Sequence, residues 1–445
     1  MHGVQITTIM ALLNKSALFT LRTVLCRACG CPQQVQHLAK SYSRDTRFPD
    51  SSPLKSQALH KLAEYSTYCG RTRRCLSGVT SSILRKEWQR PLSRVDFMDL
   101  EDIEDIIIKA ERSKHFRRFV LNPDLANLIV DCLDGDLSER NAIIFECNPG
   151  PGVLTRALLN GGAQRVVALE RDTQFLPALQ SLERRLNGQL EVVHCDFFKL
   201  DPIGRGPVRP PAMFSEKLFD DLGIPPVAWS EDIPIRVVGI FPQRNERSMI
   251  WKLIYAIYER ISVFQHGRIE MNMFMSEKEY TKLTAEAGNL KNYQALAALC
   301  QIACEIQLLH KEPWSSFATN SKNGACAIPR SSLTNDHLCL VRLTPRRDLF
   351  TQTLTAANSS TLVLMLKQCL IKRKAKLIDR LESWCPGSGE KLLMQLNLPG
   401  DVLTGDVHPE EYKELFEAME HSQDFRQSWL YDEVLENINS TVSHI

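Results

Sequence analysis

The stretch Ala142 to Thr155, AIIFECNPGPGVLT, decides the fold. Its first part, AIIFEC, is a short apolar run, which is typical of a buried strand in a parallel sheet. The run breaks at Asn148 into a turn that contains Gly150 and Gly152, and a helical pattern follows from Val153 to Asn160. Glycine lets the backbone approach a ligand closely, because no Cβ intervenes. The stretch therefore predicts a strand, a ligand-binding turn and a helix.

Other segments on both sides repeat this alternation. Upstream, Asn122-Pro123 is a helix start signal, and apolar residues at helical spacing follow it to Leu133. Three more apolar runs predict strands, and they are Arg165 to Glu170 (RVVALE), Glu191 to Asp196 (EVVHCD) and Ile235 to Phe241 (IRVVGIF). Strands separated by helices at this spacing predict an α/β fold, with a mostly parallel sheet wrapped by helices.

Two of these strands end in a carboxylate. A ligand of such a sheet binds outside the carboxyl ends of its strands. There, Glu170 can accept hydrogen bonds from two ribose hydroxyls, and Asp196 can accept one from an adenine amino group. The chain has neither GxxxxGK[ST] nor a full GxGxxG, so it lacks a pyrophosphate cradle. Taken singly, a GxG is often only a tight turn and a strand-end Asp only a helix cap. Together they point to adenosine without pyrophosphate, as in S-adenosyl-L-methionine.

The chain after residue 347 has helical patterns throughout. They run over Leu362–Ile371, Leu377–Trp384, Glu390–Leu396 and Pro409–Met419. The sequence HPEE at His408 places proline and acids in a first turn, which is a sound helix start. We predict a methyltransferase-like domain over residues 96–347, and a small C-terminal helical domain with a tail over residues 348–445.

The first 95 residues differ in charge from the rest. They hold 15 Lys and Arg against four acids, a net charge of +11, so residues 96–445 carry −9 of the overall +2. The first acid is Asp45, and the segment before it is basic and rich in hydroxyl groups. That composition predicts a mitochondrial transit peptide over residues 1–45, with a disordered basic arm as the alternative. Residues 46–95 read as a basic, Ser-rich disordered linker.

Fourteen cysteines raise the question of a metal site. Cys26, Cys29 and Cys31 are closely spaced, but no second CxxC or His pair completes four ligands. The other cysteines fall singly, many in apolar stretches, where they behave as small hydrophobes. We predict no metal. No run approaches the roughly 18 apolar residues of a membrane span, so we expect no membrane contact.

The quoted motifs resemble the rRNA adenine N6-dimethyltransferase family. ECNPGPGVLT, VVALERD with Glu170 and HCDFFKLD with Asp196 match its cofactor motifs, and Phe119-Val120 is similar to the pair that covers the methionine moiety. The resemblance covers about residues 105–435. It implies a class I S-adenosylmethionine-dependent methyltransferase fold, Rossmann-like, with S-adenosyl-L-methionine as the cofactor. The residues it implies for the cofactor are Val120, Glu146, Asn148, Gly150, Gly152, Glu170 and Asp196.

The chain departs from the family at two places. The family's catalytic strand end reads Asn-Leu-Pro-aromatic, whereas this chain has Ile240, Phe241, Pro242 and Gln243. The resemblance gives the Asn the task of accepting from the target adenine and the aromatic the task of stacking on the extruded base. Ile240 has no acceptor and Gln243 no π face, so we assign no catalytic residue. In the cofactor turn, Asn148 replaces the first glycine, although Asn tolerates left-handed geometry.

The strings EPWSSF (Glu312 to Phe317) and SWLYDE (Ser428 to Glu433) narrow the resemblance to mitochondrial members of the family. It then implies a transcription initiation factor in the mitochondrial matrix nucleoid. Such a factor works with the single-subunit mitochondrial RNA polymerase and mitochondrial transcription factor A, helps melt promoter DNA and holds the non-template strand. The alternative is an active dimethyltransferase acting on small-subunit mitochondrial rRNA. Methylation of a small molecule is disfavoured by the helical appendage.

Basic residues of the second half are candidate nucleic-acid contacts. They are Arg330, Arg342, Arg346, Arg347 and Arg373, the last in the cluster IKRKAK. A groove that accepts single-stranded RNA is already an electrostatic channel for unpaired nucleic acid. Each cluster is also compatible with a solvated surface. Trp314 is compatible with stacking on a base, but we favour a place in the core for it.

Overall fold

The computed structural model describes residues 103–111, 118–133, 137, 142–186, 188–202, 207–242, 244–317, 337–428 and 430–431. Residues Val95–Ile445 form one compact unit. The predicted transit peptide, the linker, Gln243, Arg330 and the end of the tail lie outside the described residues.

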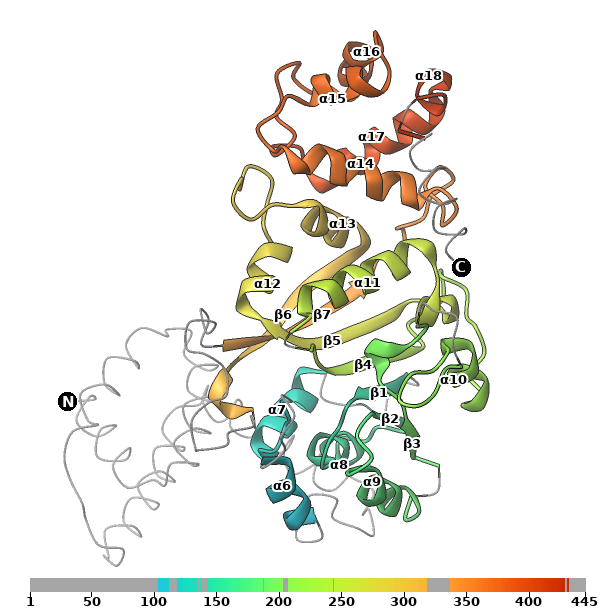
Figure 1. Cartoon of the computed structure of the whole chain (residues 1–445), viewed down its shortest axis with the longest axis vertical. Helices are drawn as coiled ribbons and strands as arrows, with labels where there is room; N and C mark the ends of the chain where they lie inside the picture. Colours follow the sequence, from blue (N-terminus) through green and yellow to red (C-terminus); the bar gives the residue numbers. More distant parts are fainter. Residues whose placement is uncertain are drawn as a thin grey trace, which may run out of the picture. The chain divides into compact units, whose positions relative to one another are not determined.

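A seven-stranded sheet forms the centre of the described part, in the order β3-β2-β1-β4-β5-β7-β6 (Figure 1). The strands are β1 (Ile143–Cys147), β2 (Val166–Glu170), β3 (Leu190–His194), β4 (Ile235–Ile240), β5 (Ile269–Ser276), β6 (Cys304–Pro313) and β7 (His337–Pro345). Strands β1 to β5 pair in parallel, whereas β7 is antiparallel to both β5 and β6. The mostly parallel sheet confirms the predicted α/β fold.

The four predicted strands form β1 to β4, and the sequence missed β5, β6 and β7. The third runs only to His194, so Asp196 follows the strand instead of closing it. Strand β5 (IEMNMFMS) escaped notice because Glu270 and Asn272 interrupt its apolar run. Both side chains are buried and find polar partners on neighbouring strands, which a local pattern does not reveal.

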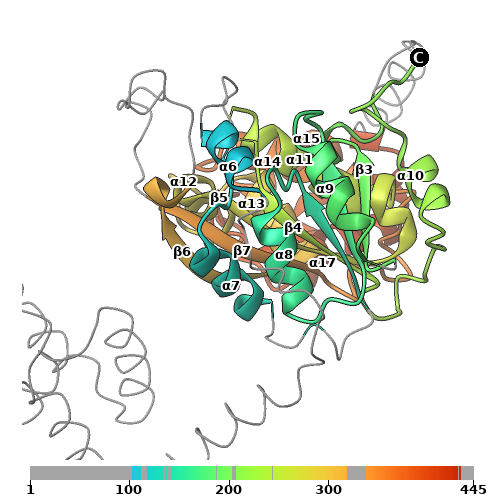
Figure 2. The same ribbon diagram turned by 90° about the horizontal axis from the view of Figure 1, so that it is seen from below.

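Helices cover both faces of the sheet (Figure 2). Those that precede or follow the first strands are α6 (Glu104–Glu111), α7 (Pro123–Cys132), α8 (Val153–Asn160), α9 (Leu176–Glu183) and α10 (Ser215–Asp221). Those between the later strands are α11 (Glu246–Glu259), α12 (Glu277–Leu283) and α13 (Ala295–Ala303), and short 3₁₀ turns are η2 (Phe197–Lys199), η3 (Ser262–His266) and η4 (Trp314–Ser316). No helix of the described residues has the length and apolarity to cross a membrane.

Alternation along the strands divides the core into two layers. Phe145 and Met271 belong to the cluster beneath α11 and α13, while Ile144 and Phe274 belong to the cluster beneath α7 and α8. Successive side chains of a strand point to opposite faces, so each strand contributes to both layers. Because β1 to β4 pair in parallel, their carboxyl ends lie along one common edge, where a ligand site is expected.

The C-terminal helices are α14 (Ser359–Ile371), α15 (Leu377–Trp384), α16 (Gly389–Gln395), α17 (Pro409–His421) and α18 (Gln423–Arg426). Helices α14 and α17 pack on α13, and α14 also contacts α11 (Figure 1). Apolar residues of α14 and α17, including Leu362 and Phe416, belong to the same core cluster as α11 and α13. The helical segment thus shares its core with the sheet layer.

The two helix start signals predicted from the sequence lie at the beginnings of α7 and α17. The Asn122 side chain accepts a hydrogen bond from the amide of Asp124 at 2.8 Å, at the beginning of α7. At α17, the Glu411 carboxylate accepts from the amide of His408 at 2.6 Å. Each cap satisfies an amide at a helix start that has no partner within the helix.

A buried polar network joins β4, β5 and β7 to the end of α7. The Glu270 carboxylate lies 3.4 Å from Arg236 Nε and 3.6 Å from Arg342 Nε. Arg236 donates to the carbonyl of Leu133 at 3.0 Å, and Arg342 to that of Cys132 at 2.9 Å. Cations at a helix C-terminus also interact favourably with its dipole. The network therefore fixes α7, whose other end adjoins Phe119-Val120.

We predict that Arg236→Met lowers the free energy of unfolding by about 3 kcal/mol, because it removes a partner from the buried Glu270 charge and a donor from α7. The double variant Arg236→Met/Glu270→Leu should lose more, because it also leaves Arg342 without its carboxylate partner. Urea unfolding followed by circular dichroism measures both. Equal stability of Arg236→Met and the unaltered chain would contradict the assigned role.

Candidate functional site

The turn after β1 adopts left-handed backbone geometry. Asn148 has φ 55°, Gly150 φ 64° and Gly152 φ 87°. Left-handed φ suits glycine and, among other residues, asparagine best. Asn148 therefore takes the conformation that the replaced glycine would have, and its amide still donates to the Leu169 carbonyl at 2.8 Å.

The Glu170 carboxylate, at the end of β2, holds this turn. One oxygen accepts from the amide of Gly150 and the other from the amide of Asp172, both at 2.7 Å. Glu170 is fully buried. A carboxylate has about four acceptor positions, so two amides leave acceptor capacity for ribose hydroxyls.

Phe119 lies against the turn, and Val120 lines the pocket beside it. A Cβ at Gly150 would come within 2.4 Å of the Phe119 ring, so only glycine allows this packing. Phe119 also meets Phe175 edge-on, with ring centroids 5.4 Å apart. A pocket opens beside them, lined by Arg118, Phe119, Val120, Glu146, Cys147, Asn148, Pro149, Leu154, Gly239 and Ile240.

Glu146 is the buried acid of this pocket. Its carboxylate accepts from the Thr155 hydroxyl at 2.6 Å. Burial raises the pKa of Glu146 to about 8; the hydrogen bond from Thr155 opposes the shift, and the nearby Glu170 charge adds to it. The side chain is thus largely neutral near pH 7. A cation in the pocket would favour its ionised form.

Asp196 lies just beyond β3, with 2% of its surface exposed. One carboxylate oxygen accepts from the amide of Phe198 at 3.1 Å, which caps η2. The other lies 3.5 Å from a guanidinium nitrogen of Arg171. Asp196 therefore caps η2. It also lies at the edge of the sheet where an adenine acceptor is expected.

The donor set fits S-adenosyl-L-methionine. Val120, Glu146 and Asn148 line one pocket, and the buried Asn148 side-chain oxygen has no hydrogen-bond partner among the described residues. Such an orphaned acceptor suits an ammonium or amide donor of a ligand. Glu170 ends β2 and Asp196 follows the adjacent β3, at the edge of the sheet where the ribose and adenine of the cofactor are expected. When bound, this cofactor supplies an electrophilic methyl group.

The degenerate catalytic motif lies at the end of β4. Ile240 lines the pocket, partly buried. Phe241 is 2% exposed and packs in the core, with its ring centroid 5.7 Å from that of Phe198. Pro242 follows, and Gln243 is outside the described residues.

Of the predicted basic contacts, the four that the structure describes (Arg342, Arg346, Arg347 and Arg373) do not line this pocket. Strand β7 runs antiparallel to β5, so Arg346 and Arg347, just beyond its end, lie at the opposite edge of the sheet from Glu170. Arg342 is committed to the buried network, also donating to Asn272 at 3.0 Å. This favours a structural role for Arg342.

The described candidates Arg347 and Arg373 differ in exposure. Arg347 is exposed and pairs with Asp232 at 2.8 Å. Arg373 donates to the backbone carbonyls of Lys291 and Tyr293 at 3.3 and 3.2 Å, which ties the α14–α15 turn to the segment before α13. Arg347 is therefore the more accessible of the pair.

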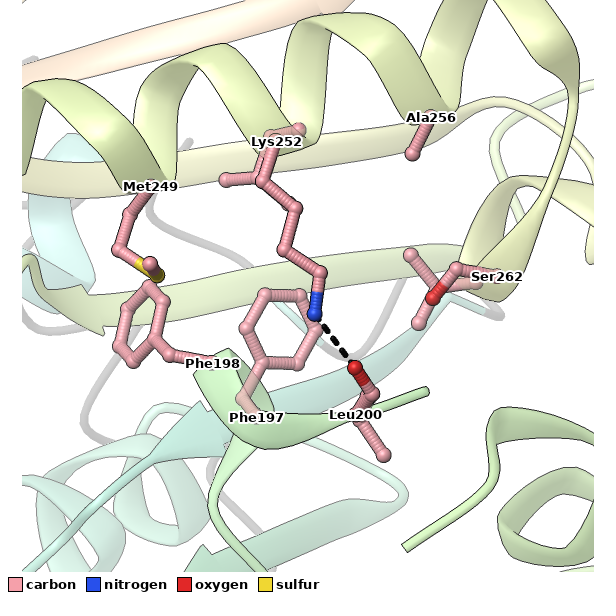
Figure 3. Close-up of a pocket in the computed structure, with 9 residues that line it drawn as sticks. Phe197, Phe198, Leu200, Met249, Lys252, Ala256 and Ser262 are labelled. Atoms are coloured by element: carbon pink, nitrogen blue, oxygen red, sulfur yellow. Dashed lines mark hydrogen bonds between the residues drawn. The ribbon is translucent and has the colours of Figure 1, made fainter. Parts of the chain in front are cut away.

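A second pocket was missed by the sequence analysis (Figure 3). It lies between η2 and α11, lined by Phe197, Phe198, Leu200, Met249, Lys252, Leu253, Ala256, Ser262 and Val263. Lys252 reaches across it to donate to the Leu200 carbonyl. Burial lowers the pKa of Lys252, against the opposing charges of Asp201 and Asp196. The one feature of the sequence that pointed to this pocket is the pair Phe197-Phe198, directly after Asp196.

Comparison with known proteins decides the family. Residues 108–421 match the profile described as ribosomal RNA adenine dimethylase. Human "Dimethyladenosine transferase 2, mitochondrial" is 45% identical over 332 residues, which cover 74% of this chain and 84% of that protein. The cattle protein of the same name is 46% identical over 322 residues, covering 72% and 81%. The chain belongs to the ribosomal RNA adenine dimethylase family.

Family membership confirms the class I methyltransferase fold and S-adenosyl-L-methionine as the cofactor. The relatives are mitochondrial, and the protein is assigned to the mitochondrion with them. Among solved structures, a dimethyladenosine transferase from Plasmodium falciparum is 16% identical, with a TM-score of 0.44, and the match covers 67% of this chain and 95% of that one.

We predict that Glu146→Gln flattens the pH dependence of stability. In the unaltered chain, Glu146 titrates near 4.5 when unfolded and near 8 when folded, so stability falls as pH rises through that window and the penalty is complete above it. Between about pH 5.5 and 7.5 the loss attributable to this group is about 2 kcal/mol. Gln has no such titration, and it keeps an acceptor for Thr155.

Urea unfolding of both proteins at several pH values measures this difference. Parallel stability curves for Glu146→Gln and the unaltered chain would show that Glu146 does not retain its proton in the folded state. Thr155→Val is the matched control, because it removes the hydrogen bond to Glu146 and leaves the carboxyl group in place.

Proposed function

We propose that this protein is a mitochondrial transcription initiation factor built on an rRNA adenine dimethyltransferase fold with weak or vestigial activity. It acts in the matrix nucleoid with the single-subunit mitochondrial RNA polymerase, and with mitochondrial transcription factor A at promoters. It helps to melt promoter DNA and holds the opened non-template strand.

One observation carries the proposal, and it is the end of β4. Ile240 lines the cofactor pocket where the family motif has an Asn acceptor, and its side chain offers no hydrogen bond to an adenine amino group. Phe241 is buried in the core and does not replace the missing aromatic. Losing one hydrogen bond and one stacking contact slows transfer roughly 10²–10⁴-fold.

The charge distribution supports a partnership with a polymerase. Residues 96–445 carry −9, so bulk positive charge does not attract nucleic acid to them. Binding then depends on local groups such as Arg347, together with the Arg330 segment and the polymerase's own DNA contacts. Arg342 is left out, because its guanidinium is engaged within the fold.

The second candidate is an active dimethyltransferase for small-subunit mitochondrial rRNA. The acids that favour it are Glu170, at the end of β2, and Asp196, just beyond the adjacent β3. The names of the relatives point the same way, since both are called dimethyladenosine transferase. If the protein is an active dimethyltransferase, Ile240 leaves the amino group of the target adenine without the acceptor that the family motif provides.

The two candidates separate in a single-turnover methylation assay on an rRNA hairpin. We expect transfer by the unaltered protein to be roughly 10²–10⁴-fold slower than by a family enzyme with Asn-Leu-Pro-aromatic. The double variant Ile240→Asn/Gln243→Tyr should recover at least about tenfold, because it restores the acceptor and the stacking face. A rate for the unaltered protein equal to that of the reference enzyme would favour the second candidate.

Promoter-specific initiation with the mitochondrial polymerase tests the first candidate. We expect Asp196→Ala to reduce cofactor binding and leave initiation within about twofold of the unaltered protein, with or without added S-adenosyl-L-methionine. Because Asp196 also caps η2, the melting temperature of the variant is measured first. Loss of initiation in a folded variant would show that cofactor binding and transcription initiation are not separable.

A further inference from the structure

Arg118 and Trp314 form a cation–π pair beside the cofactor pocket. The guanidinium carbon of Arg118 lies over the Trp314 ring, 5.2 Å from its centroid. Arg118 lines the pocket together with Asn148 and Ile240. Trp314 is half-buried and packs against the same core cluster as Ile240. The pair therefore stands next to the end of β4, where the catalytic motif is degenerate.

The topology places both residues at the ligand-binding edge. Trp314 follows the last residue of β6, Pro313, which pairs with His337 at the beginning of β7. Strand β7 pairs its Leu338 with Ser276, the last residue of β5. Because β5 is parallel to β4, this end of β6 lies at the same edge as Ile240. Arg118 directly precedes Phe119, which lies against the Gly150 turn.

The chemistry of the pair suits a nucleobase. A guanidinium is planar and weakly hydrated, and unpaired bases stack on arginine planes as well as on aromatic rings. Trp314 backs Arg118 on one side and thereby restricts its orientation. The buried indole N–H of Trp314 has no acceptor among the described residues, and a buried donor of this kind marks a place where a ligand or water completes the bond.

We propose that Arg118, backed by Trp314, is a stacking platform for an unpaired nucleobase at the mouth of the pocket. The proposal rests on the proposed function, because it takes the site to receive single-stranded nucleic acid. The platform supplies the flat surface that Ile240 and Gln243 do not, so an extruded base is held without the family's aromatic. The ligand class is single-stranded DNA or RNA.

Substitutions that separate charge from planarity test the platform in the full chain. The probes are a single strand of about 15 nucleotides carrying 2-aminopurine, made once as DNA and once as RNA. Stacking on the protein changes the 2-aminopurine fluorescence, and titration gives the affinity. We expect Arg118→Lys to bind about tenfold more weakly or worse and to lose the fluorescence change, with an unchanged dependence of affinity on salt.

Trp314→Leu should behave as Arg118→Lys does, whereas Trp314→Phe should retain most of the affinity, because a ring still backs the guanidinium. Arg184→Lys is the matched control, since Arg184 is an exposed arginine at the end of α9 that donates to the Gln180 carbonyl within the same helix. It should bind and report stacking like the unaltered protein. Melting temperatures of all four variants confirm that each is folded.

The outcomes distinguish this proposal from the proposed function. An Arg118→Lys protein that binds and changes 2-aminopurine fluorescence like the unaltered chain overturns the platform while leaving nucleic-acid binding intact. If the unaltered protein binds neither strand, the proposed function fails and the platform with it. Loss on DNA alone or on RNA alone supports the platform and identifies which strand it holds.

Discussion

The hydrogen bond from the Gly150 amide to the buried Glu170 carboxylate is the contact on which the site depends. It joins the turn after β1 to the end of β2, and the second oxygen of Glu170 holds the amide of Asp172. Gly150 has a left-handed φ of 64°, and the absence of a Cβ lets Phe119 pack directly on the turn. The pocket, its cover and the strand ends are therefore positioned together.

Local sequence patterns predicted the elements whose stability is decided locally. The apolar runs of β1 to β4 and the caps at Asn122 and His408 needed only neighbouring residues, and they were confirmed. Strand β5 was missed because its inward polar residues look wrong for a buried strand. Glu270 is acceptable there only because Arg236 and Arg342 arrive from neighbouring strands that are distant in the chain. Tertiary pairing overrode the local preference.

The same reasoning explains what could be predicted of the site. Acids at strand ends are placed by strand geometry, so Glu170 and Asp196 were predicted at one edge, and the pairing of β2 with β3 brings them there. The destination of an arginine is set by partners far along the chain, and a sequence does not show whether a guanidinium faces solvent or a helix end. Arg342 and Arg373 both donate to backbone carbonyls inside the fold. The pairing of Arg118 with Trp314 is likewise visible only in three dimensions.

Retention of the cofactor acids does not by itself discriminate between a methyltransferase and a factor that has lost the chemistry. Glu146 accepts from Thr155, Glu170 from two amides and Asp196 from the amide that begins η2. Each acid is buried, and removing its acceptor oxygens leaves backbone or hydroxyl donors without a partner. A chain selected only to fold would therefore keep an acceptor at all three positions. The end of β4 carries no such structural obligation for an Asn at Ile240, because the packing there is apolar. Folding therefore does not fix the residue at position 240, and this chain has Ile there, which offers no hydrogen-bond acceptor.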